Sequence, residues 1–176
     1  MQFHVEAAVR MTQDPVDTAW KIHAALADWT AKVDTKASFA LTIESALLVG
    51  VVTLSAKERV FHNLPGGWPT AWYVIGIVLL ATAVLFAAFV VRPRLRGGGD
   101  KLAAEAPNNF IYFGHLRHLQ PCEIEYRLEE AALLPVLSKQ LHEMSKIAWM
   151  KHRLVQWSMN LAPAGVAALA ICASVR

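Results

Sequence analysis

Charge is absent from three long stretches of the sequence. Pro69–Val91 and Leu154–Val175 contain no Asp, Glu, Lys or Arg, and Ala37–Ala56 contains a single acid, Glu44. Each stretch has about 20 residues or slightly more, and a helix of about 20 residues crosses a hydrocarbon core of about 30 Å. A core helix of a soluble bundle would show a polar face, which Pro69–Val91 lacks. The sequence therefore predicts an all-α polytopic membrane protein with three transmembrane helices.

Cysteine and catalytic motifs are equally scarce. The two cysteines, Cys122 and Cys172, provide neither a disulfide framework nor the spacing of a metal site. His115 and His118 lack a nearby Cys or acid that would complete a ligand set, and His142-Glu143 lacks the second His of an H-E-x-x-H site. The sequence has no G-x-S-x-G and no Walker loop. We therefore expect no metal, no catalytic residue and no enzymatic activity.

Charges outside the three stretches predict the orientation. Apart from Glu44, all of the 17 basic and 14 acidic residues lie outside them. The loop 57–68 has only two basic residues, Lys57 and Arg59. Many more basic residues lie near the ends of the spans that face away from this loop, and such an excess is typical of the cytoplasmic side. These basic residues are Lys32, Lys36, Arg92, Arg94, Arg96, Lys101, Lys146, Lys151 and Arg153. We expect the N-terminus and residues 92–153 to be cytoplasmic, and the C-terminus to be external.

Two of the three spans are predicted to extend into longer helices. From about Asp17 to Ala56 the residues favour helix throughout. A second helix is predicted to run from Pro135 into the third span, with an apolar 3-4 repeat from Leu134 to Ala148. The predicted layout is a cytoplasmic N-terminal segment and helix (1–36), transmembrane helix 1 (37–56), the external loop (57–68), transmembrane helix 2 (69–91), a cytoplasmic helical sensor or assembly unit (92–153) and transmembrane helix 3 (154–175).

Local signals subdivide the cytoplasmic unit. Gly97–Gly99 predicts a flexible linker after the second span. Gln120-Pro121 predicts the start of a helix that ends near Pro135, because proline suits a first helical turn. Phe110–His115 forms the densest aromatic cluster outside the spans. An isolated strand there would have no partner, so we expect helix or turn.

Four residues inside the spans interrupt their apolar character. Glu44 is either a pore-lining or gating acid, or an acid solvated at the cytoplasmic edge or paired with Lys36, Gln156 or Asn160. Gln156 and Asn160 are either hydrogen-bonding groups between helices or pore-lining groups. Pro163 removes a backbone hydrogen bond and predicts a kink that could act as a hinge.

A basic and aromatic group precedes the third span. Lys146, Trp149 and Arg153 share one broad face of the predicted helix, a combination suited to a phosphate and a stacked base. A juxtamembrane anchor made of the same residue types is the alternative interpretation. Both interpretations remain open on the sequence alone.

Three stretches resemble a known family. Asp34–Glu44 resembles the opening signature of Pycsar effector proteins of the transmembrane type, and Asn109–His115 resembles the cytoplasmic N-x-x-x-F-G segment of that family. Leu141–His152 resembles the family's helix leading into the last span. The resemblance extends from about Asp17 to Val175, and the three motifs occur in the expected order relative to the spans.

The resemblance implies a role in bacterial antiphage defence. A partner pyrimidine nucleotide cyclase would make cyclic CMP or cyclic UMP on infection. The effector would respond by impairing the bacterial inner membrane and causing abortive infection. The sequence contains no recognisable separate cyclic-nucleotide-binding domain. A ligand would therefore have to bind the compact 100–153 unit, within one subunit or between subunits, or else the trigger is something other than a nucleotide.

The leading hypothesis is therefore an oligomeric membrane effector gated by cyclic CMP or cyclic UMP, with no other cofactor. Its expected partners are the lipid bilayer, further copies of the chain and the cyclase, and no nucleic acid. The candidate ligand-binding residues are Asn109, Phe110, Tyr112, Phe113, His115, Arg117, Lys146, Trp149, Lys151 and Arg153. The candidate gating or interface residues are Glu44, Gln156, Asn160 and Pro163.

Two other functions compete with this hypothesis. A non-enzymatic scaffold or accessory membrane protein would recruit a partner through its cytoplasmic helices and would not respond to nucleotide. A small transporter is disfavoured because the sequence has no inverted repeat and only one acid within its spans.

Overall fold

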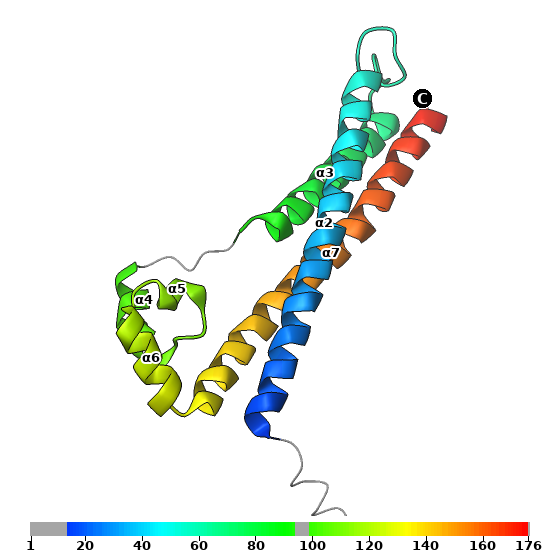
Figure 1. Cartoon of the computed structure of the whole chain (residues 1–176). Coiled ribbons are helices and arrows are strands. Elements are labelled where there is room, and N and C mark those ends of the chain that lie inside the picture. Colours follow the sequence, from blue (N-terminus) through cyan, green and yellow to red (C-terminus); the bar gives the residue numbers. More distant parts are fainter. Residues whose placement is uncertain (1–13, 94–98, 176) are drawn as a thin grey trace, which may run out of the picture. The chain divides into compact units, whose positions relative to one another are not determined.

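The computed structural model of the chain describes residues 14–93 and 99–175, and over these residues it contains helices and no strand. Three of the helices are long and apolar enough to cross a membrane, which confirms the predicted all-α membrane fold. The elements, labelled in Figure 1, are α2 (Pro15–Leu54), α3 (Trp68–Val91), α4 (Gly99–Glu105), the 3-10 helix η1 (Ala106–Asn108), α5 (Phe113–Leu116), α6 (Pro121–Glu130) and α7 (Leu133–Val175).

The described residues form two compact units. The polar unit consists of the described parts of Met1–Thr30 and Arg94–Ala148. The span unit consists of Ala31–Pro93 and the described part of Trp149–Arg176. Helices α2 and α7 each contribute residues to both units, so two of the three membrane helices continue into the polar unit as predicted.

Local sequence explains where the long helices begin and end. The Asp14 side chain accepts a hydrogen bond from the Val16 N–H at 2.9 Å, just before the first turn of α2, which is a common way to satisfy a free N–H at a helix start. Gly67 adopts a φ of +87° and precedes α3, with Pro69 in the first turn of that helix. Glycine tolerates this left-handed backbone and proline suits the first turn, so the chain reverses here.

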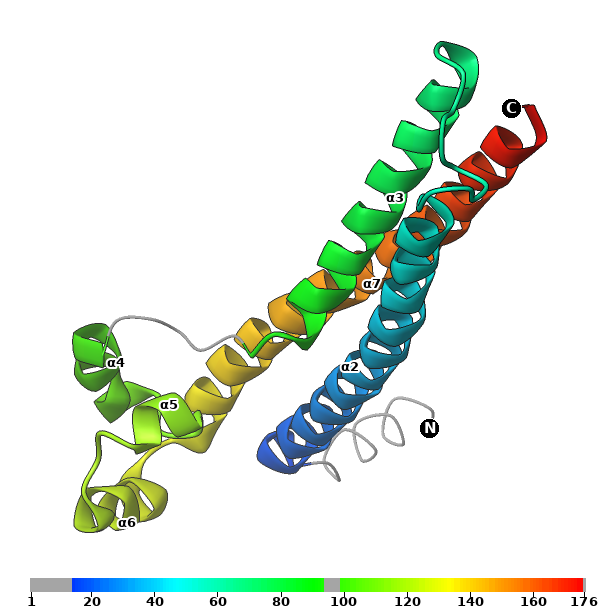
Figure 2. The same ribbon diagram turned by 90° about the horizontal axis from the view of Figure 1, so that it is seen from above.

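Helices α2, α3 and α7 run side by side in the span unit (Figures 1 and 2). At the α2–α3 hairpin the Tyr73 hydroxyl lies 2.7 Å from the Ser55 hydroxyl, and the rings of Tyr73 and Phe61 are 5.3 Å apart. Trp68 and Trp72 meet edge to face at 5.6 Å. Trp68, Trp72 and Tyr73 thus form an aromatic belt at one end of the helices, as is typical of a membrane–water interface.

Two glycines allow α3 and α7 to approach closely. A Cβ atom on Gly165 would lie 2.9 Å from the Gly76 carbonyl oxygen and 3.1 Å from the backbone nitrogen of Leu80. A Cβ atom on Gly76 would lie 2.6 Å from a carbon of Leu169. Small residues let helix backbones pack closely in a membrane, where van der Waals contact drives much of the association. These glycines therefore determine how α3 lies against α7.

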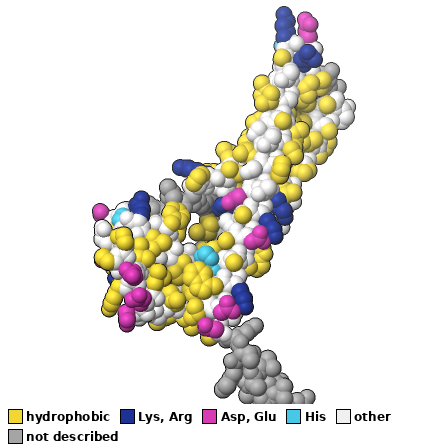
Figure 3. Space-filling model, in the orientation of Figure 1, with side chains coloured by type: hydrophobic (Ala, Val, Ile, Leu, Met, Phe, Trp, Pro, Cys, Tyr) yellow, Lys and Arg dark blue, Asp and Glu magenta, His cyan; other side chains and the backbone are white. Residues whose placement is uncertain are grey.

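Most of the span surface points away from the rest of the chain. In the most apolar 18-residue windows of α2, α3 and α7, only 17%, 28% and 33% of the residues are buried. Hydrophobic side chains cover much of the face of the spans seen in Figure 3. This apolar surface is suited to lipid or to further membrane helices.

The polar unit packs its short helices around a small core that includes Leu102, Ala106 and Phe110. The Arg127 guanidinium on α6 donates a hydrogen bond to the Pro107 carbonyl of η1. Gln120 and Glu123 form a capping box at the start of α6, so the helix start predicted at Gln120-Pro121 is confirmed.

Two boundaries in this unit differ from the prediction. Helix α6 ends at Glu130, before the predicted end near Pro135, and Pro135 lies in the first turn of α7, close to the predicted start of the second long helix. Proline is tolerated in a first turn because the N–H groups there have no helical acceptor. Gly97 and Gly98 of the predicted linker lie outside the described residues, and Gly99 begins α4. Residues 110–112 form a turn and residues 113–115 belong to α5, so the segment is turn and helix, as expected.

Candidate functional site

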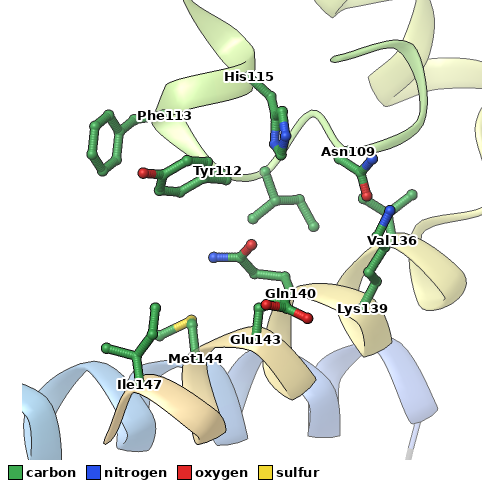
Figure 4. Close-up of a pocket in the computed structure, with 11 residues that line it drawn as sticks. Asn109, Tyr112, Phe113, His115, Val136, Lys139, Gln140, Glu143, Met144 and Ile147 are labelled. Carbon is green, nitrogen blue, oxygen red and sulfur yellow. The ribbon is translucent and has the colours of Figure 1, made fainter. Parts of the chain in front are cut away.

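A cavity of about 160 Å³ lies in the polar unit between two parts of the chain (Figure 4). One wall is the turn before α5 together with the start of that helix, and the other is one face of α7. The α7 residues recur at helical spacing, so they form a continuous strip along that helix. The lining residues are Asn109, Ile111, Tyr112, Phe113, His115, Val136, Lys139, Gln140, Glu143, Met144 and Ile147.

The local sequence folds the first wall into place. The Asn109 side-chain amide donates to the Glu105 carbonyl at 2.9 Å, which ties the turn to the end of α4. A Cβ atom on Gly114 would lie 2.3 Å from the ring of Tyr112, so the absence of a side chain lets this ring fold back over α5. The Tyr112 ring then contacts Phe113 at 4.5 Å and His115 at 5.3 Å. The result is an aromatic cluster at the cavity.

His115 is the least satisfied polar residue of the cavity. It is 4% exposed, and neither ring nitrogen has a hydrogen-bond partner among the described residues. The nearest acid oxygen, Oε2 of Glu105, is 3.5 Å from Nε2, which is longer than a normal hydrogen bond. Buried polar atoms are almost always bonded, and one left unbonded destabilises the fold. The imidazole is therefore placed to bond to something that enters the cavity (Figure 4).

The opposite wall adds polar groups to an otherwise aliphatic surface. Gln140 projects from α7 toward the cavity in Figure 4, with Lys139 and Glu143 beside it. Lys146, one turn further along, lies 3.3 Å from the Glu143 carboxylate and is not part of the lining. Aromatic rings, an unbonded imidazole, an amide and a lysine together suit a planar heterocycle that carries an anionic group.

The structure divides the predicted ligand-binding residues into two groups. Asn109, Tyr112, Phe113 and His115 line the cavity, and Phe110 is buried in the core of the same unit. The other five do not line it: they are Arg117, Lys146, Trp149, Lys151 and Arg153.

These five residues have other surroundings. Arg117 is exposed and donates from Nε to Nε2 of His118 at 3.2 Å. Trp149 and Arg153 are exposed residues of the span unit. Lys151 is only 9% exposed, and its ammonium lies 2.6 and 2.7 Å from the two carboxylate oxygens of Asp34. This ion pair links α7 to α2 within the span unit, which is a structural role that the sequence pattern did not indicate.

Sequence reasoning missed the α7 wall of the cavity. Val136, Lys139, Gln140, Glu143 and Ile147 follow one another at spacings of one, three and four residues, beside the apolar repeat that was recognised. The signal was therefore present as a second helical face. Its mixed polar composition is also typical of a solvent-exposed face, so it did not stand out.

Glu44 has a partner other than those expected. Its Oε1 accepts a hydrogen bond from the Ser158 hydroxyl at 2.6 Å, and both residues are buried. The pairing predicted with Lys36, Gln156 or Asn160 is thus not the one that the structure shows. Oε2 of Glu44 is buried without a hydrogen-bond partner among the described residues.

The other three candidate gating residues lie on α7. Gln156, Asn160 and Pro163 are all exposed in the single chain. Helix α7 continues through Pro163 to Val175. Gln156 and Asn160 are therefore available to a neighbouring molecule.

Comparison with known families gives one match. The family model described as the Pycsar effector protein domain (PycTM) matches residues 18–176. No curated protein and no solved structure matches the chain.

Proposed function

This chain belongs to the Pycsar effector family, and on that premise we propose that a cyclic pyrimidine nucleotide activates it by binding the cavity of the polar unit. Membership makes the chain an effector of antiphage defence, and its three apolar helices make it a multi-pass membrane protein. We further propose what activates the protein and what its activation does to the cell. Cyclic CMP or cyclic UMP, made by a partner cyclase, would lead the protein to impair the bacterial inner membrane and abort the infection.

The observation that carries the proposal is the buried, unbonded imidazole of His115 beside the aromatic ring of Tyr112. A pyrimidine has a flat face for aromatic contact and a polar edge for hydrogen bonds. His115 and the side-chain oxygen of Asn109 would meet that edge, with Gln140 opposite them. A neutral imidazole both donates and accepts a hydrogen bond, so it suits the mixed edge of either base.

The size of the cavity favours the base over the whole nucleotide. Its volume of about 160 Å³ is below the roughly 300–1,000 Å³ of pockets that enclose a drug-sized ligand. The base would enter, and the ribose and cyclic phosphate would remain at the mouth. Lys139 is the exposed cation of the lining, so it would contact the phosphate. Arg117, Lys146, Lys151 and Arg153, the basic residues first considered, would not be needed for this contact.

Helix α7 provides the route from ligand to membrane. It forms one wall of the cavity between Val136 and Ile147, and it continues without interruption to Val175. A ligand that pulls the Asn109–His115 turn toward this wall would favour one packing of α7 over another, which is how differential binding shifts a conformational equilibrium. Pro163 would allow the spanning part of α7 to bend independently.

We also propose on which side of the membrane the polar unit lies and how copies of the chain assemble. The polar unit would lie on the cytoplasmic side, where a cyclase product accumulates, and the C-terminus would be external. One subunit with three spans encloses no pathway through a bilayer, so a homo-oligomer would form the lesion. The lipid bilayer is then both its environment and its target.

Calorimetric titration of the purified, detergent-solubilised chain with cyclic CMP, cyclic UMP and cyclic AMP tests ligand binding. We expect one of the pyrimidine nucleotides to bind, and His115→Phe to weaken that binding by at least about tenfold, because a hydrogen bond to the base would be lost. Arg117→Ala is the matched control, since Arg117 lies in the same segment but does not line the cavity. Absence of binding by the unmodified chain, or equal binding by His115→Phe, would contradict the proposal.

A further inference from the structure

An open groove of about 560 Å³ lies between α2 and α7 in the span unit. Its walls are apolar except at one residue, Glu44. The lining residues are Ala40, Ile43, Glu44, Leu47, Met159, Ala162, Pro163, Val166 and Ala167. All of them belong to the apolar stretches expected to cross the membrane, so the groove would open onto the hydrocarbon layer.

The groove contains acceptors that the chain itself leaves incomplete. Glu44 is 3% exposed, and Oε1 receives the Ser158 hydroxyl while Oε2 has no partner among the described residues. Pro163 lines the same groove and has no N–H, so it cannot donate the helical hydrogen bond to the Met159 carbonyl. An unbonded polar group is costly in lipid, where no water replaces the missing partner. The groove therefore calls for a donor from outside the chain.

Donors of the right kind lie on the exposed surface of α7. Gln156 and Asn160 are exposed in the single chain and carry side-chain amides within the third span. With Pro163 and Ala167 they recur at spacings of four, three and four residues, so the amide stripe ends at the lip of the groove. Amides within a span commonly hydrogen-bond across to another helix.

The amides of Gln156 and Asn160 lie at about the same depth in the membrane as Glu44. The bond between Glu44 and Ser158 places the acid at the level of Ser158 on α7. Gln156 and Asn160 are each two residues from Ser158, which is about 3 Å along a helix axis. Copies of one protein insert with the same orientation, and rotation about the membrane normal does not change depth. The amides of one copy are therefore at the height of Glu44 in its neighbour.

We propose that the groove receives α7 of a second copy of this chain, with the Asn160 amide donating to Oε2 of the neighbour's Glu44. Ala40, Ala162 and Ala167 line the groove with small side chains that permit close approach of a helix. The contact joins unlike surfaces, groove and amide stripe, so each copy can both offer and receive a helix, and a rotation that closes would give a ring. It deepens the proposed effector function by assigning the surface through which the copies assemble.

The mass of the full chain in mild detergent, measured by mass photometry without nucleotide, tests this interface. Asn160→Leu nearly preserves side-chain size and removes the amide, and Asn160 is exposed in the single chain, so the fold of the subunit should survive. We expect the unmodified chain to form oligomers and Asn160→Leu to weaken association by about tenfold. Glu44→Leu should do the same, and the double variant should be no weaker than the more affected single one, because both remove one bond.

Thr82→Val is the control, because the Thr82 hydroxyl donates to the Val78 carbonyl of its own helix α3 at 2.7 Å and lies outside the groove. This variant should assemble like the unmodified chain. A monomeric unmodified chain, or Asn160→Leu oligomers as stable as the unmodified ones, would overturn the interface and leave lipid as the occupant of the groove. No nucleotide is present, so loss of ligand binding and loss of assembly are measured separately.

Discussion

The span unit and the polar unit differ in whether particular polar side chains are bonded within the chain. In the span unit the hydroxyls of Thr35 and Thr42 donate to carbonyls four residues earlier in α2, and Lys151 pairs with Asp34. In the polar unit the imidazole of His115 is buried at a cavity with neither nitrogen bonded. The hydroxyls in the span unit are bonded within the chain, because lipid would offer them no other partner, whereas the imidazole at the cavity remains available to a ligand.

Two buried polar atoms of the span unit have no hydrogen-bond partner among the described residues. The Trp72 indole N–H is buried without a partner among the described residues, and it lies in the aromatic belt, which is typical of the membrane–water interface. Oε2 of Glu44 has no partner either, but it lies in an apolar groove within the spans. The two proposals assign each of these atoms a partner: a small ligand would bond to His115 in the polar unit, and a helix of a second copy would bond to Glu44 in the span unit.

The largest effect is expected where the span unit is most tightly packed. Gly165→Val would place side-chain atoms against backbone atoms of Gly76 and Leu80, so we expect it to destabilise the protein by about 3 kcal/mol. Gly50→Val is the matched control, since nothing lies within 4 Å of a Cβ there. Thermal unfolding in detergent should show a much lower unfolding temperature for Gly165→Val and little change in that temperature for Gly50→Val. Equal stability of the two variants would argue against the close approach of α3 and α7.

A substitution in the polar unit should stabilise the protein, in contrast to Gly165→Val. His115→Phe removes two buried nitrogen atoms that have no hydrogen-bond partner among the described residues, Glu105 being 3.5 Å away, so we expect it to raise the free energy of unfolding by about 1–3 kcal/mol. Chemical denaturation followed by circular dichroism measures this change. A loss of stability would mean that the imidazole is bonded in the absence of ligand, and the contrast between the two units would then be wrong.

A smaller effect is expected at the ion pair of the span unit. Lys151→Met would leave Asp34 unpaired, and because the Asp34 side chain is 39% exposed water can partly solvate it, so the loss should be about 1 kcal/mol. Adding Asp34→Asn to this variant should recover most of the loss, since no unpaired charge remains. Thermal unfolding of the single and double variants provides the measurement. No recovery in the double variant would indicate that Lys151 contributes through packing alone.

A still smaller effect is expected at the turn before α5. Gly114→Ala would press a Cβ atom against the Tyr112 ring, and a flexible side chain can move away at little cost in stability. The ring would then no longer flank the cavity, so we expect the affinity for the nucleotide to fall about threefold to tenfold. Titration calorimetry measures it. Unchanged affinity would show that the base does not stack on Tyr112.

The smallest effect is expected at Arg117. Its side chain is exposed and does not line the cavity, so Arg117→Ala should change neither nucleotide affinity nor stability by more than about 0.5 kcal/mol. The same titration and unfolding experiments check this expectation. A marked loss of affinity would restore the earlier view that Arg117 contacts the ligand.

The sequence was sufficient for the features that depend on neighbouring residues. Length and lack of charge identified the spans, and Gln120-Pro121 identified the start of α6. On α2, Leu26, Val33, Ala37 and Glu44 recur at helical spacing and are buried, whereas Trp29, which belongs to the same series, is 54% exposed. Periodicity thus indicated the packed face, and one large side chain on it nevertheless remains outside.

The features that depend on how helices rotate against one another could not be predicted. Helix α3 is apolar on every side, so nothing in its pattern marks Gly76 as the contact with α7. Nothing in the sequence pairs Ser158 with Glu44, because their bond depends on how α2 and α7 face each other. In the same way, half of the cavity was found from its aromatic cluster, and the half on α7 resembled a solvated helix face.

The most direct test of the central claim is the membrane potential of cells that express the protein with and without a pyrimidine cyclase that supplies cyclic CMP or cyclic UMP. The account predicts depolarisation only when one of these nucleotides is present, and no depolarisation with His115→Phe expressed at the same level. Depolarisation without nucleotide, or its absence in a well-expressed and membrane-inserted protein, would contradict a ligand-gated effector. The second result would favour the scaffold interpretation.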